Sequence, residues 1–276
     1  MKLVHTVAEL RSLLAPGQAA FVPTMGNLHA GHLALVAQAR AVAPQAPVVL
    51  SLFVNRLQFL PHEDFDRYPR TLDTDCAQLQ AQGACDIVFA PDEAELYPEP
   101  QGYRLVPPPE LADILEGQFR PGFFTGVCTV VHKLFNLVQP AHAVFGKKDY
   151  QQLMVLRRMV AQMGLPICVH GGETLRSSEG LALSSRNQYL SAEQKMQALQ
   201  LSAALRALIA AWQGGARDRE RLEGEAMDHL AARGWQPDYL TLRRRHDLGP
   251  ARDGEALVAL GAARLGSTRL IDNLEF

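Results

Sequence analysis

Two histidines three positions apart, His29 and His32, form the most informative local pattern of the chain. They lie on either side of Gly31, just after the apolar segment 19–24, which is typical of a strand. Gly26 allows the chain to turn off that strand, so that a helix begins near Gly31. Backbone N–H groups at a helix N-terminus attract phosphate, and imidazoles at i and i+3 share one side of the turn. The pattern predicts stabilisation of an α-phosphate during in-line displacement, the alternative being two structural histidines at a loop–helix junction.

A second polar cluster lies in FGKKDYQQL, which follows an apolar strand and opens a helix. Lys147 and Lys148 fall where a strand C-terminus meets a helix N-terminus, a natural position for a phosphate or ribose. Asp149 could belong to the same phosphate or ribose site. The alternative is that its side chain caps the helix. Gln151 and Gln152 are unusually polar for a first turn. We expect one of them to face the site.

Two further clusters have the residue types of a ligand site. Ser184, Ser185 and Arg186 place two hydroxyls beside a guanidinium, which suits a polyphosphate leaving group. An ordinary turn is the alternative. Asn55 and Gln58 follow the second apolar strand and neighbour an aromatic residue, an arrangement that suits a small hydroxy acid. Here the alternative is a loop without a ligand role.

The elements that position these residues alternate along the first two thirds of the chain. Four apolar segments with little period-2 alternation predict strands buried on both faces of a parallel sheet, at 19–24, 48–55, 86–91 and 143–146. Amphipathic patterns predict helices between and after them, at 31–43, 72–82, 126–138 and 149–163. This alternation predicts an α/β fold, a Rossmann-like open parallel sheet with its sites at the strand carboxyl ends.

The pattern changes after about residue 172. A long amphipathic helix at 190–212 precedes a second helix and short strands, as expected for a smaller C-terminal α+β lid domain. We therefore predict a nucleotide- and substrate-binding domain at 1–174 and a lid domain at 175–276. The glycine-containing segment 171–180 is expected to act as the hinge on which the lid closes.

Composition narrows the class of protein. The 276 residues include 27 Lys and Arg against 29 Asp and Glu, a net charge of −2, which argues against a protein that coats nucleic acid or an anionic membrane. The basic run Arg243 to Arg245 is expected at a solvated strand end. Four cysteines without a C-x-x-C pair predict neither a disulfide framework nor a zinc site. With no signal-peptide pattern and no long apolar run, we expect a reduced cytoplasmic protein.

Taken together, the motifs resemble those of one family. The chain is similar to the pantoate–β-alanine ligases (pantothenate synthetases), which belong to the H-x-G-H nucleotidyltransferases. The resemblance covers residue 20 to the C-terminus, and its blocks are PTMGNLHAGH (23–32), VNRLQF (54–59), DRYPRT (66–71), FRPGFFTGVCTVVHKLFNLVQP (119–140), FGKKDYQQL (145–153), GLALSSRNQYLS (180–191) and GSTRLIDN (266–273).

The resemblance implies an activity. Enzymes of this family condense (R)-pantoate with β-alanine through a pantoyl adenylate, consuming ATP and releasing AMP and pyrophosphate. No covalent enzyme nucleophile is needed. Mg²⁺ is expected to arrive with ATP, the partners are small molecules rather than nucleic acid or membrane, and a homodimer is expected.

The resemblance also assigns the site residues. His32 takes the family's proton-donor position with His29 beside it, although both imidazoles could act only as hydrogen-bond donors. The ATP-binding set is Met25, Gly26, Asn27, Leu28, His29, Ala30, Gly31, His32, Gly146, Lys147, Lys148, Asp149, Leu175, Leu183, Ser184, Ser185 and Arg186. Substrate contacts fall on Gln58, Gln152, Asn55 and Arg120. Asp75 is the candidate indirect partner of the metal.

Several positions depart from the family pattern. Arg56 replaces a proline and could narrow or recharge the pantoate pocket. Phe123 replaces a histidine, and Lys147 replaces an acidic residue beside the triphosphate. The remaining departures are Ser177, Glu179 and Leu183.

Three other functions stay open from the sequence. One is a nucleotidyltransferase that makes a dinucleotide, which would not need two glutamines at a small hydroxy acid. The others are a catalytically weakened nucleotide-binding relative and an RNA-binding relative, for which Arg243 to Arg245 would be the basic patch.

Overall fold

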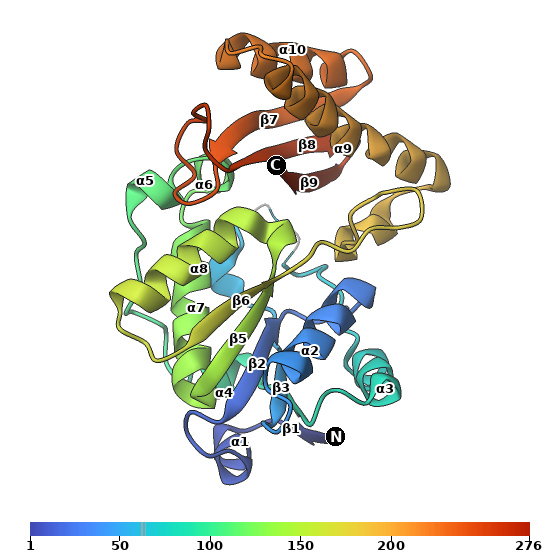
Figure 1. The fold of residues 1–276 in the computed structure, drawn as a ribbon. Helices are drawn as coiled ribbons and strands as arrows, with labels where there is room; N and C mark the ends of the chain where they lie inside the picture. Colours follow the sequence, from blue (N-terminus) through green and yellow to red (C-terminus); the bar gives the residue numbers. More distant parts are fainter. Residues whose placement is uncertain (62, 64) are drawn as a thin grey trace. The chain divides into compact units, whose positions relative to one another are not determined.

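The computed structural model describes residues 1–61, 63 and 65–276, and the chain forms two compact units (Figure 1). The N-terminal unit comprises Met1–Lys147 and Gln152–Glu173. The C-terminal unit comprises Thr174–Phe276 together with the short segment Lys148–Gln151. The residues that follow β5, the strand Pro140–Gly146, therefore belong in part to the C-terminal unit, although the rest of that unit comes later in the chain.

The N-terminal unit is built on a six-stranded sheet in which every pair is parallel, in the order β1-β4-β3-β2-β5-β6. The strands are β1 (Lys2–Val4), β2 (Ala19–Thr24), β3 (Val48–Leu52), β4 (Ile87–Phe89), β5 (Pro140–Gly146) and β6 (Cys168–Gly172). Ala20, Val22, Val48 and Leu50 are fully buried, as expected for strands covered on both faces. The predicted Rossmann-like α/β class is confirmed.

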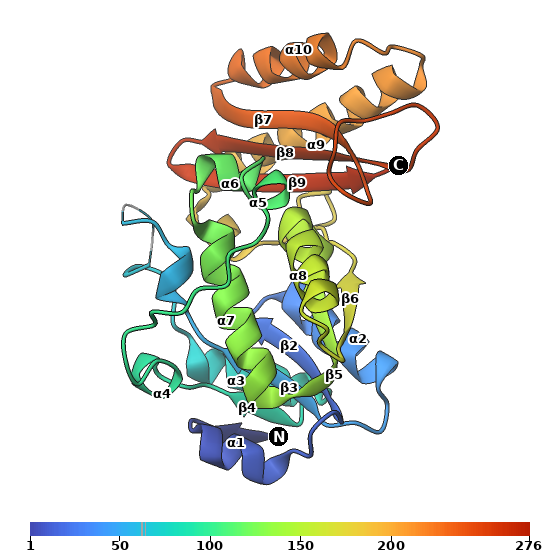
Figure 2. The same cartoon turned by 90° about the vertical axis from the view of Figure 1, so that its left-hand side faces the viewer.

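Helices cover both faces of this sheet (Figures 1 and 2). On one face, Val36 of α2 and Leu79 of α3 pack with Val22 and Val144 in one buried cluster. On the other face, the ring of Phe135 in α7 contacts Phe21 and Phe145 edge-on. The helices are α1 (Val7–Leu13), α2 (Ala30–Val42), α3 (Leu72–Gln82), α4 (Glu93–Leu96), α5 (Pro109–Ala112), α6 (Glu116–Phe119), α7 (Phe123–Val138) and α8 (Tyr150–Gln162), with 3₁₀ turns η1 (Arg56–Gln58) and η2 (Lys147–Asp149).

One part of the predicted hinge is wrong. Gly171 and Gly172 are the last residues of β6 and pair with Phe145 and Gly146. A Cβ on Gly172 would lie 2.2 Å from Leu35 Cδ2, so glycine is needed there for the close approach of α2 to the sheet rather than for bending. The strands β1 and β6 and the helices α1, α4, α5 and α6, all of which are short, were not predicted from the sequence.

The C-terminal unit pairs three antiparallel strands with two helices. The elements are η3 (Ser185–Tyr189), α9 (Ala192–Gln213), α10 (Arg219–Ala231), β7 (Trp235–Arg244), β8 (Leu257–Leu265) and β9 (Thr268–Glu275). Both helices cover one face of the sheet (Figure 2). A Cβ on Gly261 of β8 would lie 3.1 Å from Leu201 and 3.2 Å from Leu205, which shows how closely α9 approaches that strand. The predicted α+β composition is confirmed.

None of the helices in the described part of the chain combines the length and the apolar character required to traverse a bilayer.

Candidate active site

The carboxyl ends of β2, β3 and β5 meet at one edge of the parallel sheet. Thr24 pairs with Leu52 where β2 and β3 end. On the other side of β2, Phe21 pairs with Ala143 of β5, which runs on parallel to β2 and ends at Gly146. The strand order reverses at β2, because β3 lies on one side of it and β5 on the other. Ligands of open α/β sheets bind at such a switch point, so the segments after these three strands border the candidate site.

The imidazole rings of His29 and His32 cap the amino end of α2. His29 Nδ1 accepts the N–H of Gly31 at 3.1 Å, and His32 Nδ1 accepts the N–H of His29 at 3.3 Å. The ring centroids are 4.1 Å apart, which confirms that both imidazoles lie on one side of the turn. Because each Nδ1 accepts a backbone hydrogen, each neutral ring carries its own hydrogen on Nε2. The capping contacts therefore fix both rings as Nε2–H donors.

Asp75 of α3 holds the turn that joins β2 to α2. Its Oδ1 accepts the N–H of Leu28 at 2.8 Å. Its Oδ2 accepts the N–H of Asn27 at 3.0 Å and the hydroxyl of Thr71 at 3.1 Å. Gly26 has a φ of +85°, and a Cβ there would lie 3.2 Å from the same oxygen, so this position requires glycine. Asp75 is only 1% exposed, and both of its carboxylate oxygens bond to protein donors.

Asn55 organises the segment after β3. Its Nδ2 donates to Gln58 Oε1 at 3.0 Å and to the carbonyl of Gly126 at 3.2 Å, and the residue is 1% exposed. Its Oδ1 accepts the hydroxyl of Tyr97 at 3.0 Å, and burial raises the pKa of that phenol, which stays a donor. Gln58 Nε2 lies 3.2 Å from the sulfur of Met25. The structure thus brings together Met25 and Gln58, which come from separate motifs.

The departure at Arg56 is accommodated on the surface of the N-terminal unit. Its guanidinium lies 3.9 Å from the centroid of the Phe65 ring. Its Nε pairs with Glu93 at 3.1 Å, and its side chain is 57% exposed. From the sequence, Arg56 could recharge the pantoate pocket. In the structure its positive charge is instead paired with Glu93 outside the core.

Arg120 and the departure at Phe123 form one stacked pair. The guanidinium of Arg120 lies 3.7 Å from the centroid of the Phe123 ring. It also binds Glu63 through Nε at 2.6 Å and Nη2 at 2.7 Å, and Nη2 donates to the carbonyl of Gln58 at 3.2 Å. Arg120 thus contacts the backbone of a predicted substrate residue, and its charge is balanced by Glu63.

The carboxyl end of β5 carries the lysine that departs from the family pattern. Lys147 forms an ion pair with Glu173, which follows β6, so the added positive charge has an acidic partner. Of the two glutamines expected near the site, Gln151 is 3% exposed, whereas Gln152 is partly exposed. Gln152 is therefore the more accessible of the two side chains.

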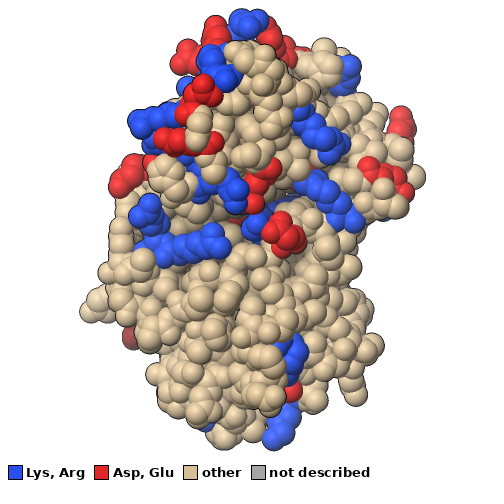
Figure 3. Space-filling model, in the orientation of Figure 1, with Lys and Arg blue, Asp and Glu red and all other residues tan. Residues whose placement is uncertain are grey.

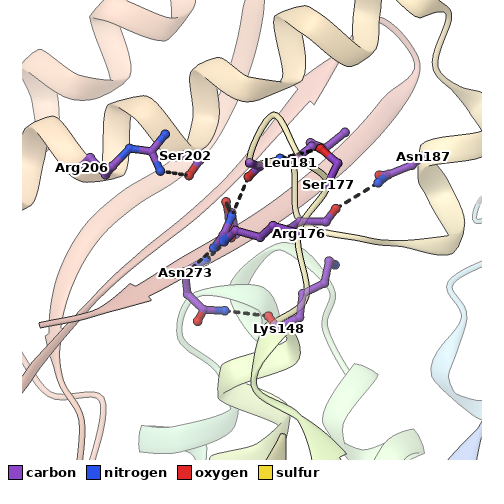
Figure 4. A network of polar contacts seen from close by, with 11 residues as sticks. Lys148, Arg176, Ser177, Leu181, Asn187, Ser202, Arg206 and Asn273 are labelled. Atoms are coloured by element: carbon purple, nitrogen blue, oxygen red, sulfur yellow. Dashed lines mark hydrogen bonds and ion pairs between the residues drawn. The ribbon is translucent and has the colours of Figure 1, made fainter. Parts of the chain in front are cut away.

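The segment after Lys147 bonds to the last strand of the C-terminal unit. Asn273 Nδ2 in β9 donates to the carbonyl of Lys148 at 2.8 Å (Figure 4). The hydroxyl of Tyr150 donates to Glu275 Oε1 at 2.9 Å. Two predicted nucleotide residues, Lys148 and Asp149, consequently belong to the C-terminal unit.

A short hairpin precedes the serine-rich cluster. The N–H of Leu183 donates to the carbonyl of Leu175 at 2.9 Å, and Arg176 is bridged to Ala182. Arg176 reaches β9, where its guanidinium binds both carboxylate oxygens of Asp272 at 2.8 Å (Figure 4). Because Asp272 is 5% exposed, this pair ties the hairpin firmly to the sheet of its unit.

The serine-rich cluster itself opens η3. Ser184 Oγ accepts the N–H of Arg186 at 3.2 Å, and the side chain of Asn187 donates to the carbonyl of Ala182 at 3.0 Å. Ser184 to Arg186 lie in the C-terminal unit, whereas His29 and His32 lie in the N-terminal unit. The predicted phosphate residues are thus distributed over both units.

The basic run Arg243 to Arg245 lies at the end of β7, as expected, but it is not simply solvated. Arg244 pairs with Asp247 at 2.6 Å and is 11% exposed. Arg245 pairs with Glu275 at 3.0 Å. On the face drawn in Figure 3, acidic and basic side chains are interspersed over the C-terminal unit. The run therefore contributes to ion pairs of its own unit.

Sequence reasoning missed two contributors to the site. Asp75 was expected beside a metal, and its role in holding the turn could not be inferred because its partners are 47 and 48 positions away. Asn273 belongs to a block that resembled the family, but no role was assigned to it. The adjacent polar residues Asp272 and Asn273, between Ile271 and Leu274, were the available signal.

Comparison with known proteins agrees with this geometry. The family model of pantoate–β-alanine ligase matches residues 2–275. A protein named pantothenate synthetase from Leptothrix cholodnii is 65% identical over 286 aligned positions, with all of both chains covered.

Solved structures lead to the same family. The crystal structure of the pantothenate synthetase from Thermus thermophilus is 48% identical, with a TM-score of 0.93 over 100% of this chain and 99% of that one. A pantoate–β-alanine ligase from Francisella tularensis, complexed with a β,γ-ATP compound and β-alanine, is 29% identical, with a TM-score of 0.80 over 100% and 97% of the two chains. The chain belongs to the pantoate–β-alanine ligase family.

Proposed function

We propose that the protein joins (R)-pantoate to β-alanine in two steps through a pantoyl adenylate. In the first step, a carboxylate oxygen of pantoate attacks the α-phosphorus of ATP, and pyrophosphate leaves in line. In the second step, the neutral amine of β-alanine attacks the acyl carbon and expels AMP. Family membership supports the overall reaction, and the Francisella relative with an ATP compound and β-alanine supports both small molecules as substrates.

The observation that carries the first step is the reciprocal capping of α2 by two imidazoles. His29 and His32 bind backbone hydrogens through Nδ1, which makes their Nε2–H groups preset donors at a helix N-terminus. Charge on the α-phosphate grows as the pentacoordinate state forms, and fixed donors stabilise it without reorganising. We therefore assign both histidines to charge stabilisation at the transferred phosphate.

Asp75 acts in this proposal as a positioning residue. A carboxylate whose oxygens accept two backbone N–H groups and a hydroxyl has little capacity left for a metal ion. Mg²⁺ accordingly enters as part of the MgATP substrate, bound by phosphate oxygens and water rather than by Asp75. The role of Asp75 is to fix the backbone of Asn27 and Leu28, against which the nucleotide lies.

Pantoate is assigned to the segment after β3. Gln58 is oriented by Asn55, which is itself held by Gly126 and Tyr97, so the amide of Gln58 is preorganised. Gln152, the more accessible member of the glutamine pair, supplies the second amide. Amides suit the hydroxyls and carboxylate of pantoate because each offers both a donor and an acceptor.

The remaining nucleotide contacts are assigned to the C-terminal unit. Lys148 and Asp149 are proposed to bind phosphate and ribose, the backbone of Leu175 to meet the adenine, and Leu183 to Arg186 to bind the leaving pyrophosphate. Arg120 is proposed to border the substrates through its contact with Gln58. Lid closure by the C-terminal unit would complete the site when ATP binds.

A stepwise assay tests the reaction. Purified protein with MgATP and pantoate alone should exchange labelled pyrophosphate into ATP, and AMP should be released in full turnover only when β-alanine is added. Exchange that does not depend on pantoate would point instead to a dinucleotide-forming nucleotidyltransferase. Tight, salt-dependent RNA binding without exchange would support an RNA-binding relative.

We also propose a cytoplasmic homodimer. Four free thiols among the described residues fit a reducing compartment, and the dimer is proposed from the family. Light scattering of the purified chain tests the dimer, since a mass of one chain would exclude it.

A further inference from the structure

Three side chains that bind metals gather at the edge of the six-stranded sheet opposite the candidate active site. His142 of β5 pairs in register with Cys168 of β6, and His170 follows two positions later. Paired residues and residues two apart share one face of a sheet, so the three side chains project together. Their ligand atoms all lie within 4.8 Å of one another. Within the described residues, no other group of three or more His, Cys, Asp or Glu side chains meets this criterion.

The spacing of these atoms is close to that of a tetrahedral metal site. His142 Nδ1 and His170 Nε2 are 3.1 Å apart. With Zn–N of about 2.0–2.1 Å and Zn–S of about 2.3 Å, a tetrahedral angle places two nitrogens roughly 3.3 Å apart and a nitrogen and a sulfur roughly 3.6 Å apart. Because the three ligand atoms already lie within 4.8 Å of one another, small side-chain rotations would bring them to these separations. Cys168 is exposed, which leaves its sulfur free to adjust.

We propose that His142, Cys168 and His170 bind a Zn²⁺ ion, with water as the fourth ligand. Two imidazoles and a thiolate match the borderline softness of zinc, whereas Mg²⁺ prefers oxygen ligands. Binding forms two Zn–N bonds and one Zn–S bond, and the proton of the Cys168 thiol is released to solvent.

The site is separate from the Mg²⁺ that accompanies ATP. His142 precedes Gly146 by four residues of extended strand, which corresponds to roughly 13 Å. His142 and Cys168 lie toward the amino ends of their strands and His170 lies at mid-strand, whereas the predicted nucleotide residues follow the carboxyl ends. Its effect is structural, because an ion held by β5 and β6 joins the edge strand to its neighbour.

This site also explains why cysteine spacing gave no sign of zinc. His142 and Cys168 are 26 positions apart along the chain, and only the parallel register makes them neighbours. A search for C-x-x-C pairs finds sites built within one loop, not sites assembled by strand pairing.

Zinc binding to the full-length, chelator-treated and reduced protein tests the proposal. Equilibrium dialysis against low micromolar free Zn²⁺ should give one bound ion per chain and raise the melting temperature. Co²⁺ in place of Zn²⁺ should give intense tetrahedral visible bands and a thiolate-to-cobalt charge-transfer band. His142→Gln and His170→Gln should each weaken zinc binding at least tenfold, and Cys168→Ser should abolish the charge-transfer band.

Cys76→Ser provides the matched control, because Cys76 is a partly buried thiol on α3, outside the cluster. This variant should bind Zn²⁺ and Co²⁺ as the unaltered protein does. Far-UV circular dichroism without metal should be the same for all four variants, which separates lost ligands from lost folding. The proposal would be overturned if the unaltered protein bound no Zn²⁺, or if the charge-transfer band survived Cys168→Ser. It would also be overturned if the two histidine variants bound Zn²⁺ as tightly as the unaltered protein.

Discussion

The carboxylate of Asp75 accepts the backbone N–H of Leu28 at 2.8 Å, across 47 positions of sequence. The second oxygen accepts the neighbouring N–H of Asn27, so one buried side chain fixes two consecutive peptide groups. Hydrogen bonds to a charged acceptor are stronger than those to a neutral one. The backbone path of the turn before His29 is therefore set by Asp75 of α3 as well as by Gly26.

Asp75→Asn should raise the KM for ATP and lower the rate of pantoate-dependent pyrophosphate exchange. The amide keeps the size of the side chain but removes the charge and presents hydrogens to backbone donors. A loss of about 1.5–3 kcal/mol, or roughly 10- to 150-fold in kcat/KM, is expected. Asp73→Asn, an exposed position on the same helix, should leave both constants unchanged. Rescue of the variant by excess Mg²⁺ would identify Asp75 as a metal partner instead.

His32→Ala should abolish most adenylation while the fold is retained. Removal of one preset donor at a transferring group costs on the order of 10²–10³ in kcat. The lost cap adds about 1 kcal/mol of destabilisation, which thermal unfolding should register as a modest shift. His229→Gln, an exposed histidine of α10, serves as the control and should retain full exchange activity. Near-normal turnover by folded His32→Ala would remove His32 from the mechanism.

Arg56→Ala should leave the KM for pantoate within about twofold of its original value. The guanidinium is paired with Glu93 and stacked on Phe65, and an exposed pair of this kind contributes about 1 kcal/mol or less to stability. Steady-state kinetics with pantoate as the varied substrate provides the measurement. A tenfold change in KM would mean that Arg56 reaches the substrate after all.

Asn273→Ala should raise the KM for ATP several-fold with little effect on the KM for pantoate. The change removes the donor to the carbonyl of Lys148, so the first turn after β5 loses an anchor worth about 1 kcal/mol. Asn136→Ala, on an exposed face of α7, should change neither constant. An equal rise in both KM values would indicate general damage to the C-terminal unit.

Native-state alkylation should distinguish the four thiols. Burial raises the pKa of Cys85 and of Cys128 to about 12, so at pH 8.5 roughly one molecule in 3,000 carries the thiolate at either position. Their reactivity should increase about tenfold per pH unit until the protein unfolds. In metal-free protein Cys168, which is exposed, should react with iodoacetamide first, as read by mass spectrometry. Rapid labelling of Cys85 in folded protein would contradict the structure.

The sequence predicted what is encoded locally. Strands such as β2 and helices such as α2 have enough consecutive apolar or amphipathic residues to be recognised, and the pair His29 and His32 is close in sequence as well as in space. β6 escaped because it is five residues long, half-exposed and ends in Gly171 and Gly172, which resemble a linker.

Contacts between distant segments could not be predicted in the same way. The partners of Asp75, and the bond from Asn273 to Lys148 across 125 positions, depend on how elements are arranged rather than on their composition. In the sequence, a polar residue that bonds to a distant segment has the same kind of neighbours as a polar residue on the surface.

The assignment of Lys148–Gln151 to the C-terminal unit limits how the protein can be divided. Cutting the chain at residue 174 would remove the bond from Asn273 to Lys148 and the bond from Tyr150 to Glu275. The C-terminal unit is consequently not a transferable module: grafting residues 174–276 onto another sheet would carry the serine cluster but leave behind Lys148. Any functional chimera of two relatives must exchange both segments together.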